Sequence, residues 1–160
     1  MTAPAALDDA LDAAIALRRA GSFDEAETSL RALTAQAPAD ARPWANLGQL
    51  LRDTERLDEA VAALRRAVAL TPDHGPTVAV LGDCLHRLGR LHAADTAIRR
   101  SIALGFTDNP AVWTLLANNS RYLGRVVDVI DALERAFALA PHTADMHNNL
   151  GIYFTVTGRF

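Results

Sequence analysis

The amino-acid sequence predicts an all-α protein built from successive helix–turn–helix units. Three observations lead to this fold class. Half of the 160 residues are apolar, with 32 alanines and only 6% aromatic residues, which is typical of helix-rich proteins. Apolar residues recur three and four positions apart, as on one face of an α-helix. The same short pattern returns about every 34 residues, so we expect four full units and a partial fifth.

The first helix of each unit carries the clearest copy of the pattern. Residues 44–51 read WANLGQLL, and residues 78–85 read VAVLGDCL. Later copies begin at Trp113 and His147. A second block, RLDEA at residues 56–60, is matched by SFDEA at 22–26 and by RLHAA at 90–94. Both blocks keep the same spacing, so each unit is expected to hold two amphipathic helices.

The two blocks define the boundaries of the units. After a leader at residues 1–6, the units cover residues 7–40, 41–74, 75–109 and 110–143, and a partial unit covers 144–160. A glycine separates the two helices in most units, at a turn that needs a residue tolerant of positive φ: Gly21, Gly89, Gly124 and Gly158. In the second unit Glu55 takes this place.

Polar residues mark the expected helix starts. Asp40, Asp108 and Thr143 are placed to cap the first helix of the unit that follows them. Ser22 and Glu25 have the spacing of a capping box at a second helix. The third unit departs from the others, because it carries one extra residue around residues 105–107.

This pattern resembles the tetratricopeptide repeat over nearly the whole chain. The resemblance implies a right-handed α-α superhelix of four full repeats plus a half, with a concave groove lined by the first helices. Small residues at the eighth and twentieth positions let the paired helices approach closely. The residues expected to pack the repeats are Ala14, Trp44, Leu47, Gly48, Ala60, Leu81, Gly82, Ala94, Trp113, Ala117, Leu150 and Gly151.

The last repeat stops at its second helix. Gly158 and Arg159 correspond to the turn that precedes a second helix in the other repeats. A solenoid usually closes with a polar capping helix, so we expect the chain to be the amino-terminal part of a longer bacterial protein, or its end to be covered by another molecule. The alternative is a native half repeat that acts as its own cap.

Several classes of function are disfavoured by composition and motifs. Residues 1–9 do not have the basic segment that is typical of a secretory signal, and no apolar run is long enough for a membrane span. The net charge of −3 gives no general attraction for nucleic acid or anionic lipid. Neither a catalytic motif nor a metal-binding histidine pair is present, and Cys84 is the lone cysteine. We therefore expect a non-catalytic cytoplasmic protein without cofactor, metal, nucleic acid or membrane as a partner.

The candidate site is the groove that the resemblance implies. Positions 2, 5, 6, 9 and 13 share one face of each first helix, with position 12 at its rim. The tentative partner-binding residues are Arg19, Arg42, Asn46, Gln49, Arg52, Asp83, His86, Arg87, Asn118, Arg121, Tyr122 and Asn149. Amide side chains match the donor and acceptor of an extended peptide backbone.

The groove arginines have two interpretations. Arg52, Arg87 and Arg121 would hold acidic groups on the partner, or they would only complement the negative end of the helix dipole. Arginines toward the ends of the second helices are expected to face solvent. A clamp for a carboxy-terminal carboxylate, known in this family, is excluded because only Asn46 fits, and the other clamp positions hold Leu11, Ile15, Pro76 and Val80.

These observations predict non-catalytic binding of a protein or peptide in the groove. The alternative is a substrate-recruiting or oligomerising arm of an enzyme of the glycosyltransferase, sulfotransferase or hydroxylase type, with its catalytic domain beyond Phe160. A third possibility is self-association through the uncapped half repeat.

Overall fold

The computed structural model describes residues 3–141 together with Gly151 and Gly158. Residues 3–141 form eight α-helices and no strand, which confirms the all-α fold class. The helices are α1 (Ala3–Arg19), α2 (Phe23–Gln36), α3 (Ala41–Asp53), α4 (Leu57–Leu70), α5 (Gly75–Arg87), α6 (Leu91–Ala103), α7 (Pro110–Tyr122) and α8 (Val126–Leu139). The predicted half repeat, with Asn149 and Leu150, lies outside the described residues apart from Gly151 and Gly158.

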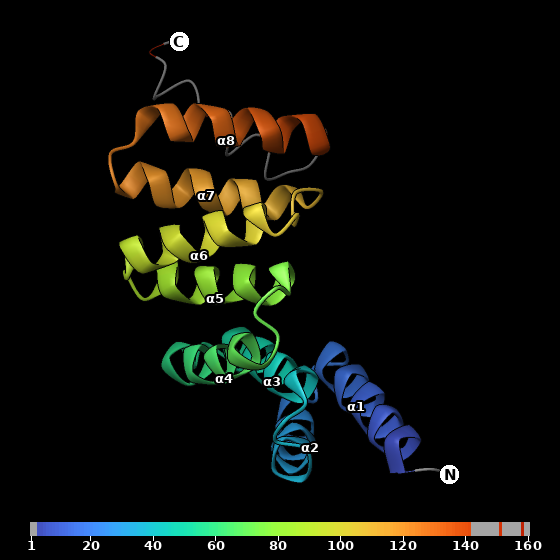
Figure 1. The fold of residues 1–160 in the computed structure, drawn as a ribbon. Coiled ribbons are helices and arrows are strands. Elements are labelled where there is room, and N and C mark those ends of the chain that lie inside the picture. The colour runs from blue at the N-terminus through green and yellow to red at the C-terminus, as the bar shows by residue number, and fades with distance from the viewer. Residues whose placement is uncertain (1–2, 142–150, 152–157, 159–160) are drawn as a thin grey trace.

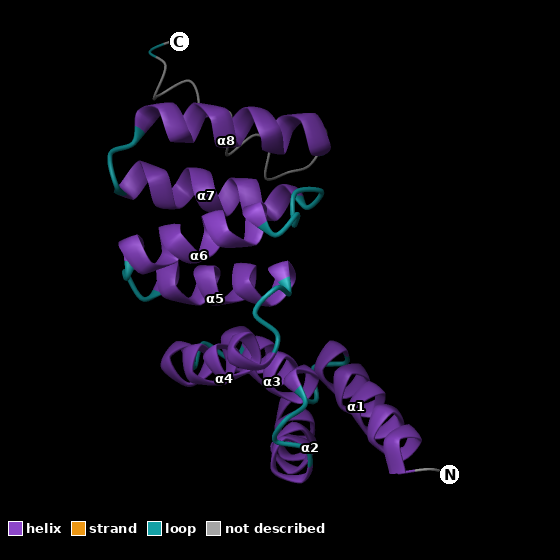
Figure 2. Cartoon of the chain, viewed as in Figure 1, coloured by secondary structure: helices purple, strands orange, loops and turns teal. Residues whose placement is uncertain are grey.

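The helices form hairpins that stack along one direction (Figure 1). Each odd-numbered helix contacts the even-numbered helix after it, and each hairpin contacts the next through α2 and α3, α4 and α5, and α6 and α7. The odd-numbered helices also contact one another in order, so the first helices of the hairpins share one side of the stack. Short loops join the helices, and the lower hairpins are rotated relative to the upper ones (Figure 2). The arrangement is the predicted helical solenoid.

The core repeats with the sequence. One large aliphatic side chain per repeat is fully buried at the twenty-fourth position: Leu30, Leu64, Ile98 and Leu133. A Cβ atom added to Gly48 would lie 2.5 Å from Cγ of Leu64, and one added to Gly82 would lie 2.8 Å from Cγ1 of Ile98. Glycine at the eighth position therefore lets the two helices of the repeat approach closely.

The other residues expected to pack the repeats fall into two groups. Those that are buried with Gly48 and Gly82 are Ala14, Leu47, Ala60, Leu81, Ala94 and Ala117. Trp44 and Trp113 are half-buried and pack against the core. Their indole N–H groups donate to backbone carbonyls of the preceding loop, Trp44 to Pro38 at 3.3 Å and Trp113 to Thr107 at 2.8 Å. Gly151 is an exposed helical residue.

The turn inside each hairpin uses the same backbone conformation. The fifteenth residue has positive φ in the four complete repeats, with values of 83° at Gly21, 62° at Glu55, 71° at Gly89 and 70° at Gly124. Gly158, at the same position of the partial repeat, has φ 64°. Glu55 adopts a conformation that favours glycine, so the turn geometry is maintained by the repeat even where its usual residue is missing.

The predicted cap at Asp40 is confirmed, and the cap predicted at Asp108 is wrong. The Asp40 carboxylate accepts from the backbone N–H of Arg42 at 2.9 Å. Helix α7 is instead capped by Asn109, whose side chain accepts from the N–H of Ala111 at 2.9 Å. The extra residue in the preceding loop moves the helix start by one position. Thr143 lies outside the described residues.

The predicted capping box at Ser22 is also wrong. Ser22 precedes α2, but its side chain makes no capping hydrogen bond. Its ψ of 65° differs from the extended conformation in which a cap side chain reaches back to the helix N–H groups. The tight turn at Gly21 imposes this geometry on the residue that follows it.

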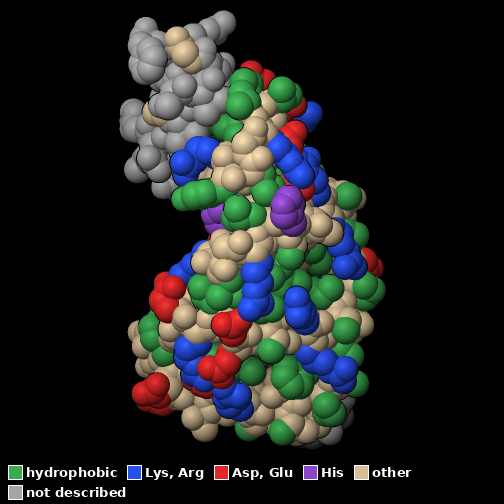
Figure 3. All heavy atoms as spheres, turned by 90° about the vertical axis from the view of Figure 1, so that its left-hand side faces the viewer, with side chains coloured by type: hydrophobic (Ala, Val, Ile, Leu, Met, Phe, Trp, Pro, Cys, Tyr) green, Lys and Arg blue, Asp and Glu red, His purple; other side chains and the backbone are tan. Residues whose placement is uncertain are grey.

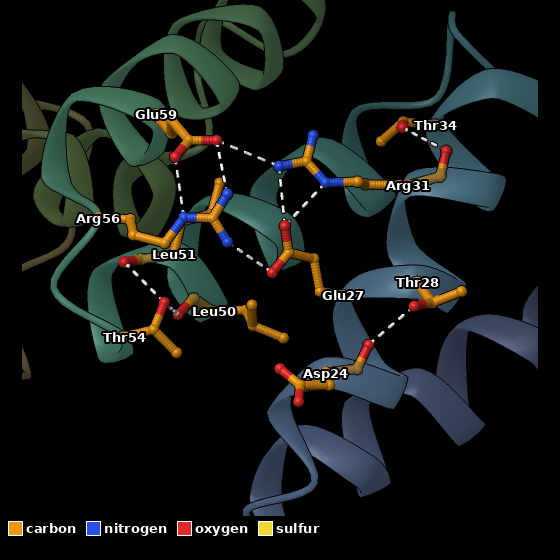
Figure 4. A network of polar contacts seen from close by, with 10 residues as sticks. All are labelled: Asp24, Glu27, Thr28, Arg31, Thr34, Leu50, Leu51, Thr54, Arg56 and Glu59. Carbon is orange, nitrogen blue, oxygen red and sulfur yellow. Dashed lines mark hydrogen bonds and ion pairs between the residues drawn. The ribbon is translucent and has the colours of Figure 1, made fainter.

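A cluster of four charged residues joins the first two repeats on the side of the even-numbered helices (Figure 4). Arg56 pairs with Glu27 of the preceding repeat at 2.6 Å and with Glu59 at 2.7 Å. Arg31 pairs with Glu27 at 2.8 Å and with Glu59 at 3.2 Å. We call this group the charged cluster. Arg31 was expected only to face solvent, whereas its guanidinium connects α2 to α4.

Equivalent positions form a second charged cluster between the third and fourth repeats. Arg125 pairs with Asp95 at 2.7 Å, Arg99 pairs with Asp95 at 3.1 Å, and Arg99 also pairs with Asp128. The junction between these clusters differs, because the position of Glu27 and Asp95 is taken in the second repeat by the buried Val61. The junction between the second and third repeats therefore lacks the charged cluster, and Arg90 pairs there with Asp58 at 2.8 Å.

Candidate functional site

Two adjoining cavities lie along the first helices of the second, third and fourth repeats. The first, of about 590 Å³, is called the α3–α5 cavity and is lined by Arg42, Asn46, Gln49, Leu70, His74 and Thr77, among others. The second, of about 370 Å³, is called the α5–α7 cavity and is lined by Gln49, Arg52, Val80, Asp83, Phe106 and Leu115, among others. Gln49 lines both, so the two cavities form one groove across the odd-numbered helices.

The structure brings five of the predicted binding residues into this groove. They are Arg42, Asn46, Gln49, Arg52 and Asp83. A third cavity of about 490 Å³, at the ends of α5 and α7, is lined by His86, Arg87 and Tyr122. Arg121 is exposed beside it, Asn118 is half-buried on α7, and Arg19 is exposed at the end of α1.

The amide groups of Asn46 and Gln49 are oriented by hydrogen bonds within the chain. Nδ2 of Asn46 donates to the backbone carbonyl of Arg42 at 2.9 Å, which leaves the side-chain carbonyl as an acceptor. Oε1 of Gln49 accepts from Arg18 at 3.2 Å, which leaves the amide nitrogen as a donor. Among the described residues neither remaining group has a partner, so the α3–α5 cavity offers one acceptor and one donor from adjacent turns of α3.

The arginines beside the groove are paired with carboxylates. Arg18 pairs with Asp53 at 2.6 Å, and Arg52 pairs with Asp53 at 2.8 Å and with Asp83 at 3.8 Å. We call this row the ion-pair ladder. It connects α1, α3 and α5. The face drawn in Figure 3 shows positive and negative side chains intermixed.

Two further predicted arginines also have acidic partners. Arg87 pairs with Glu55 of the preceding repeat, and Arg42 pairs with Asp40 at 2.7 Å and with Asp8 at 2.8 Å. The hydrogen bond from Arg42 holds the pKa of Asp40 below its ordinary value despite partial burial. From the sequence, these arginines could either contact a ligand or complement the charge of a helix end. The sequence did not identify their acidic partners in neighbouring repeats, which are Asp83 for Arg52 and Glu55 for Arg87.

The loop with the extra residue forms a wall of the α5–α7 cavity. Gly105 has φ 86°, and the backbone N–H of Phe106 donates to the carbonyl of Ser101 at 3.1 Å. A Cβ atom on Gly75, at the start of α5, would lie 2.9 Å from Cβ of Phe106. The glycine at 75 therefore makes room for Phe106 beside the groove. Sequence reasoning identified the insertion but not Phe106 as a lining residue.

Asn119 is a further residue that sequence reasoning missed. It is fully buried, and its side chain donates to the backbone carbonyl of Leu91 at 3.0 Å. Its Oδ1 lies 3.0 Å from Nδ1 of His86, so Nδ1 carries the proton in this contact. The His86 ring lies 5.6 Å from that of Tyr122, over which the guanidinium of Arg121 is placed at 4.7 Å. The sequence feature that could have identified Asn119 is an amide side chain at the tenth position of the repeat, where the other repeats have Ala16, Leu50 and Cys84.

The remaining reactive groups have structural surroundings. Burial, with a smaller effect of the Asp83 carboxylate, raises the pKa of the buried Cys84 thiol to about 11. Nδ1 of His74 accepts from the N–H of Thr77 at 3.4 Å and so caps α5. In residues 3–141 no three His, Cys, Asp or Glu side chains come together as a metal site would require. No helix in that part of the chain is long and apolar enough to cross a membrane.

Comparison with protein-family models gives one family. Two sequence models, both described as tetratricopeptide repeat, match residues 11–74 and residues 51–118. Together they cover the first three predicted repeats and part of the fourth. No curated protein sequence matches the chain significantly.

Solved structures show the same fold at low sequence identity. A crystal structure of MamA protein superposes with a TM-score of 0.82 at 21% identity, covering 95% of this chain and 82% of that one. MamA from Desulfovibrio magneticus RS-1 gives 0.84 at 19% identity, covering 95% and 85%. PilF of Pseudomonas aeruginosa gives 0.83 at 17% identity, covering 96% and 71%. At these identities the likeness supports the fold alone.

Proposed function

Because the chain belongs to the tetratricopeptide repeat family, we propose that it is a non-catalytic protein-interaction module whose groove holds an extended segment of a partner protein. The groove is the continuous pair of cavities along α3, α5 and α7. The segment lies across these helices and contacts more than one repeat.

The amide pair on α3 is the observation that carries this proposal. An extended peptide presents N–H and C=O groups along each edge, and these groups lose hydrogen bonds to water when they are buried. The free carbonyl of Asn46 accepts from a backbone N–H, and the free amide nitrogen of Gln49 donates to a backbone carbonyl. Both amides are already fixed by the chain, so less side-chain entropy is lost on binding.

The acidic groups expected on the partner belong to the same proposal. Arg52 and Arg87 have carboxylate partners within the chain. Arg121 has no carboxylate partner among the described residues, and its guanidinium lies over the ring of Tyr122. We therefore assign the contact with an acidic group to Arg121.

Selection from a random library of 12-residue peptides displayed on phage tests the proposed function. Peptides that bind the wild-type chain are synthesised, and their affinities are measured by fluorescence polarisation. The double substitution Asn46→Ala and Gln49→Ala is expected to weaken binding about tenfold, because two backbone hydrogen bonds are lost. The control is Gln36→Ala, an exposed amide at the end of α2. A library that yields no binder, or binders that the two variants affect equally, would overturn the proposed function.

A further inference from the structure

We propose that the α5–α7 cavity is a specificity pocket for a bulky apolar side chain of the partner segment, and that a lysine or arginine next to this side chain pairs with Asp83. This inference rests on the proposed function and names the chemistry of the segment. It is carried by the lining of the cavity, by the placement of Phe106 and by the charge of Asp83 in that lining.

The lining of the α5–α7 cavity is mainly apolar. Val80 of α5, Val112 and Leu115 of α7, and Phe106 of the connecting loop form its walls. The volume of about 370 Å³ lies within the size range of pockets that hold small ligands. Burying a leucine-sized side chain in such surroundings removes its apolar surface from water, which favours binding. The pocket can therefore serve as the anchor of a peptide segment.

Phe106 makes this cavity different from the adjoining one. The α3–α5 cavity is lined by Leu70 and three alanines together with polar side chains such as Asn46 and His74, and its lining includes no aromatic ring apart from that of His74. The aromatic wall of the α5–α7 cavity depends on the inserted residue in the loop and on the close approach permitted by Gly75. One groove thus offers backbone contacts over α3 and a pocket with an aromatic wall one repeat further along.

Two charged residues, Arg52 and Asp83, line the pocket, and Asp83 is the acidic one. Its carboxylate is about one third exposed, and its one ion-pair partner among the described residues is Arg52 at 3.8 Å. Arg52 lies closer to Asp53, at 2.8 Å, and Asp53 also holds Arg18. The carboxylate of Asp83 accepts no hydrogen bond from any described residue, so a cationic side chain beside the apolar anchor would meet an acid with unused acceptor capacity.

The library described above tests this proposal by the composition of the selected peptides. Groove-binding peptides are expected to share a leucine, isoleucine, methionine or phenylalanine next to a lysine or arginine. Val80→Phe fills the pocket and is expected to weaken these peptides at least tenfold. The control is Val127→Phe, at a site on α8 that is 70% exposed. Circular dichroism establishes that both variants are folded.

A charge exchange provides a second test that does not depend on core packing. Asp83→Lys is expected to weaken the selected peptide about tenfold, and a peptide with glutamate in place of its lysine or arginine is expected to recover binding to this variant. Failure of this recovery would overturn the assignment of Asp83.

The outcomes separate this inference from the proposed function. Peptides that lose affinity in the Asn46 and Gln49 double variant, but share no apolar residue and are unaffected by Val80→Phe, would overturn this inference alone. A library without any groove-binding peptide would overturn both.

Discussion

Gly48 lies where the two helices of the second repeat come closest. In an exposed helix position, replacing glycine by alanine raises stability by about 1 kcal/mol. Here the new Cβ would lie 2.5 Å from Cγ of the fully buried Leu64 and 3.3 Å from the carbonyl oxygen of Ala60. Because Leu64 is fully buried, relieving this clash requires core side chains to shift, and we expect that cost to outweigh the gain in helix propensity.

We therefore expect Gly48→Ala to lower the free energy of unfolding by about 1–3 kcal/mol, measured by urea denaturation. The control is the same substitution in a Leu64→Ala background, where the opposing side chain is absent and Gly48→Ala should be neutral or stabilising. An increase in stability in the wild-type background would contradict the proposed close approach.

Individual residues show which features of the candidate site could be predicted from the sequence and which could not. The groove faces of the first helices follow from the repeat period, which placed Asn46, Gln49 and Asp83 beside a groove. The partners of Arg52 and Arg87 do not follow from it, because Asp83 and Glu55 reach them through the stacking of one repeat on another. The direction of Phe106 depends on the path of its loop, which the sequence marks only as an insertion.

The charged cluster joins α2 to α4 and makes their contact dependent on pH. Partial burial acts to raise the pKa of Glu27, but the hydrogen bonds and charges of Arg31 and Arg56 together act more strongly in the other direction. The pKa of Glu27 therefore lies below its ordinary value of 4.5. A carboxyl group whose pKa is lowered by folding stabilises the folded state above its unfolded pKa, and this contribution is lost as the pH falls through the folded pKa.

Glu27→Gln is expected to lower the free energy of unfolding at pH 7 by up to about 1 kcal/mol, since the partners of Glu27 are largely exposed. The difference from wild type should shrink as the pH is lowered from 7 to 3, because below pH 4.5 Glu27 binds a proton more readily in the unfolded chain than in the folded one. Urea denaturation at both pH values measures this difference in the free energy of unfolding. Glu25→Gln is the control, because Glu25 of the same helix has no ion pair among the described residues. An equal difference at both pH values would assign the effect to packing.

The helices themselves were predictable because each one repeats a known apolar spacing. The residues that cap the helices were harder to predict, because a capping hydrogen bond depends on the backbone angles of one residue. Asp40 and Asp108 have similar sequence contexts, but the inserted residue before α7 places Asn109 at the capping position. The significance of Val61, which takes the place of the cluster carboxylate in the second repeat, is visible in the sequence only after the structure shows which positions meet across neighbouring repeats.

The solenoid as a whole is held by contacts between neighbouring helices. Helices α1 and α2 contact each other and α3, whereas α7 and α8 contact each other and the helices of the third repeat. No contact of comparable extent joins the first repeat to the fourth in residues 3–141. Stability in such a stack is close to a sum of repeat terms and nearest-neighbour terms, so damage to one end need not unfold the other.

Leu30 and Leu133 provide a matched test, because both are fully buried at the twenty-fourth position of their repeats. Either leucine-to-alanine substitution should lower the free energy of unfolding of its own repeat by about 2–5 kcal/mol. Hydrogen exchange followed by mass spectrometry should show loss of protection in α1 and α2 for Leu30→Ala, with α7 and α8 close to wild type. Leu133→Ala should give the reverse pattern. Equal loss of protection in all eight described helices would contradict the nearest-neighbour account, because it would mean that the described stack unfolds as one cooperative unit.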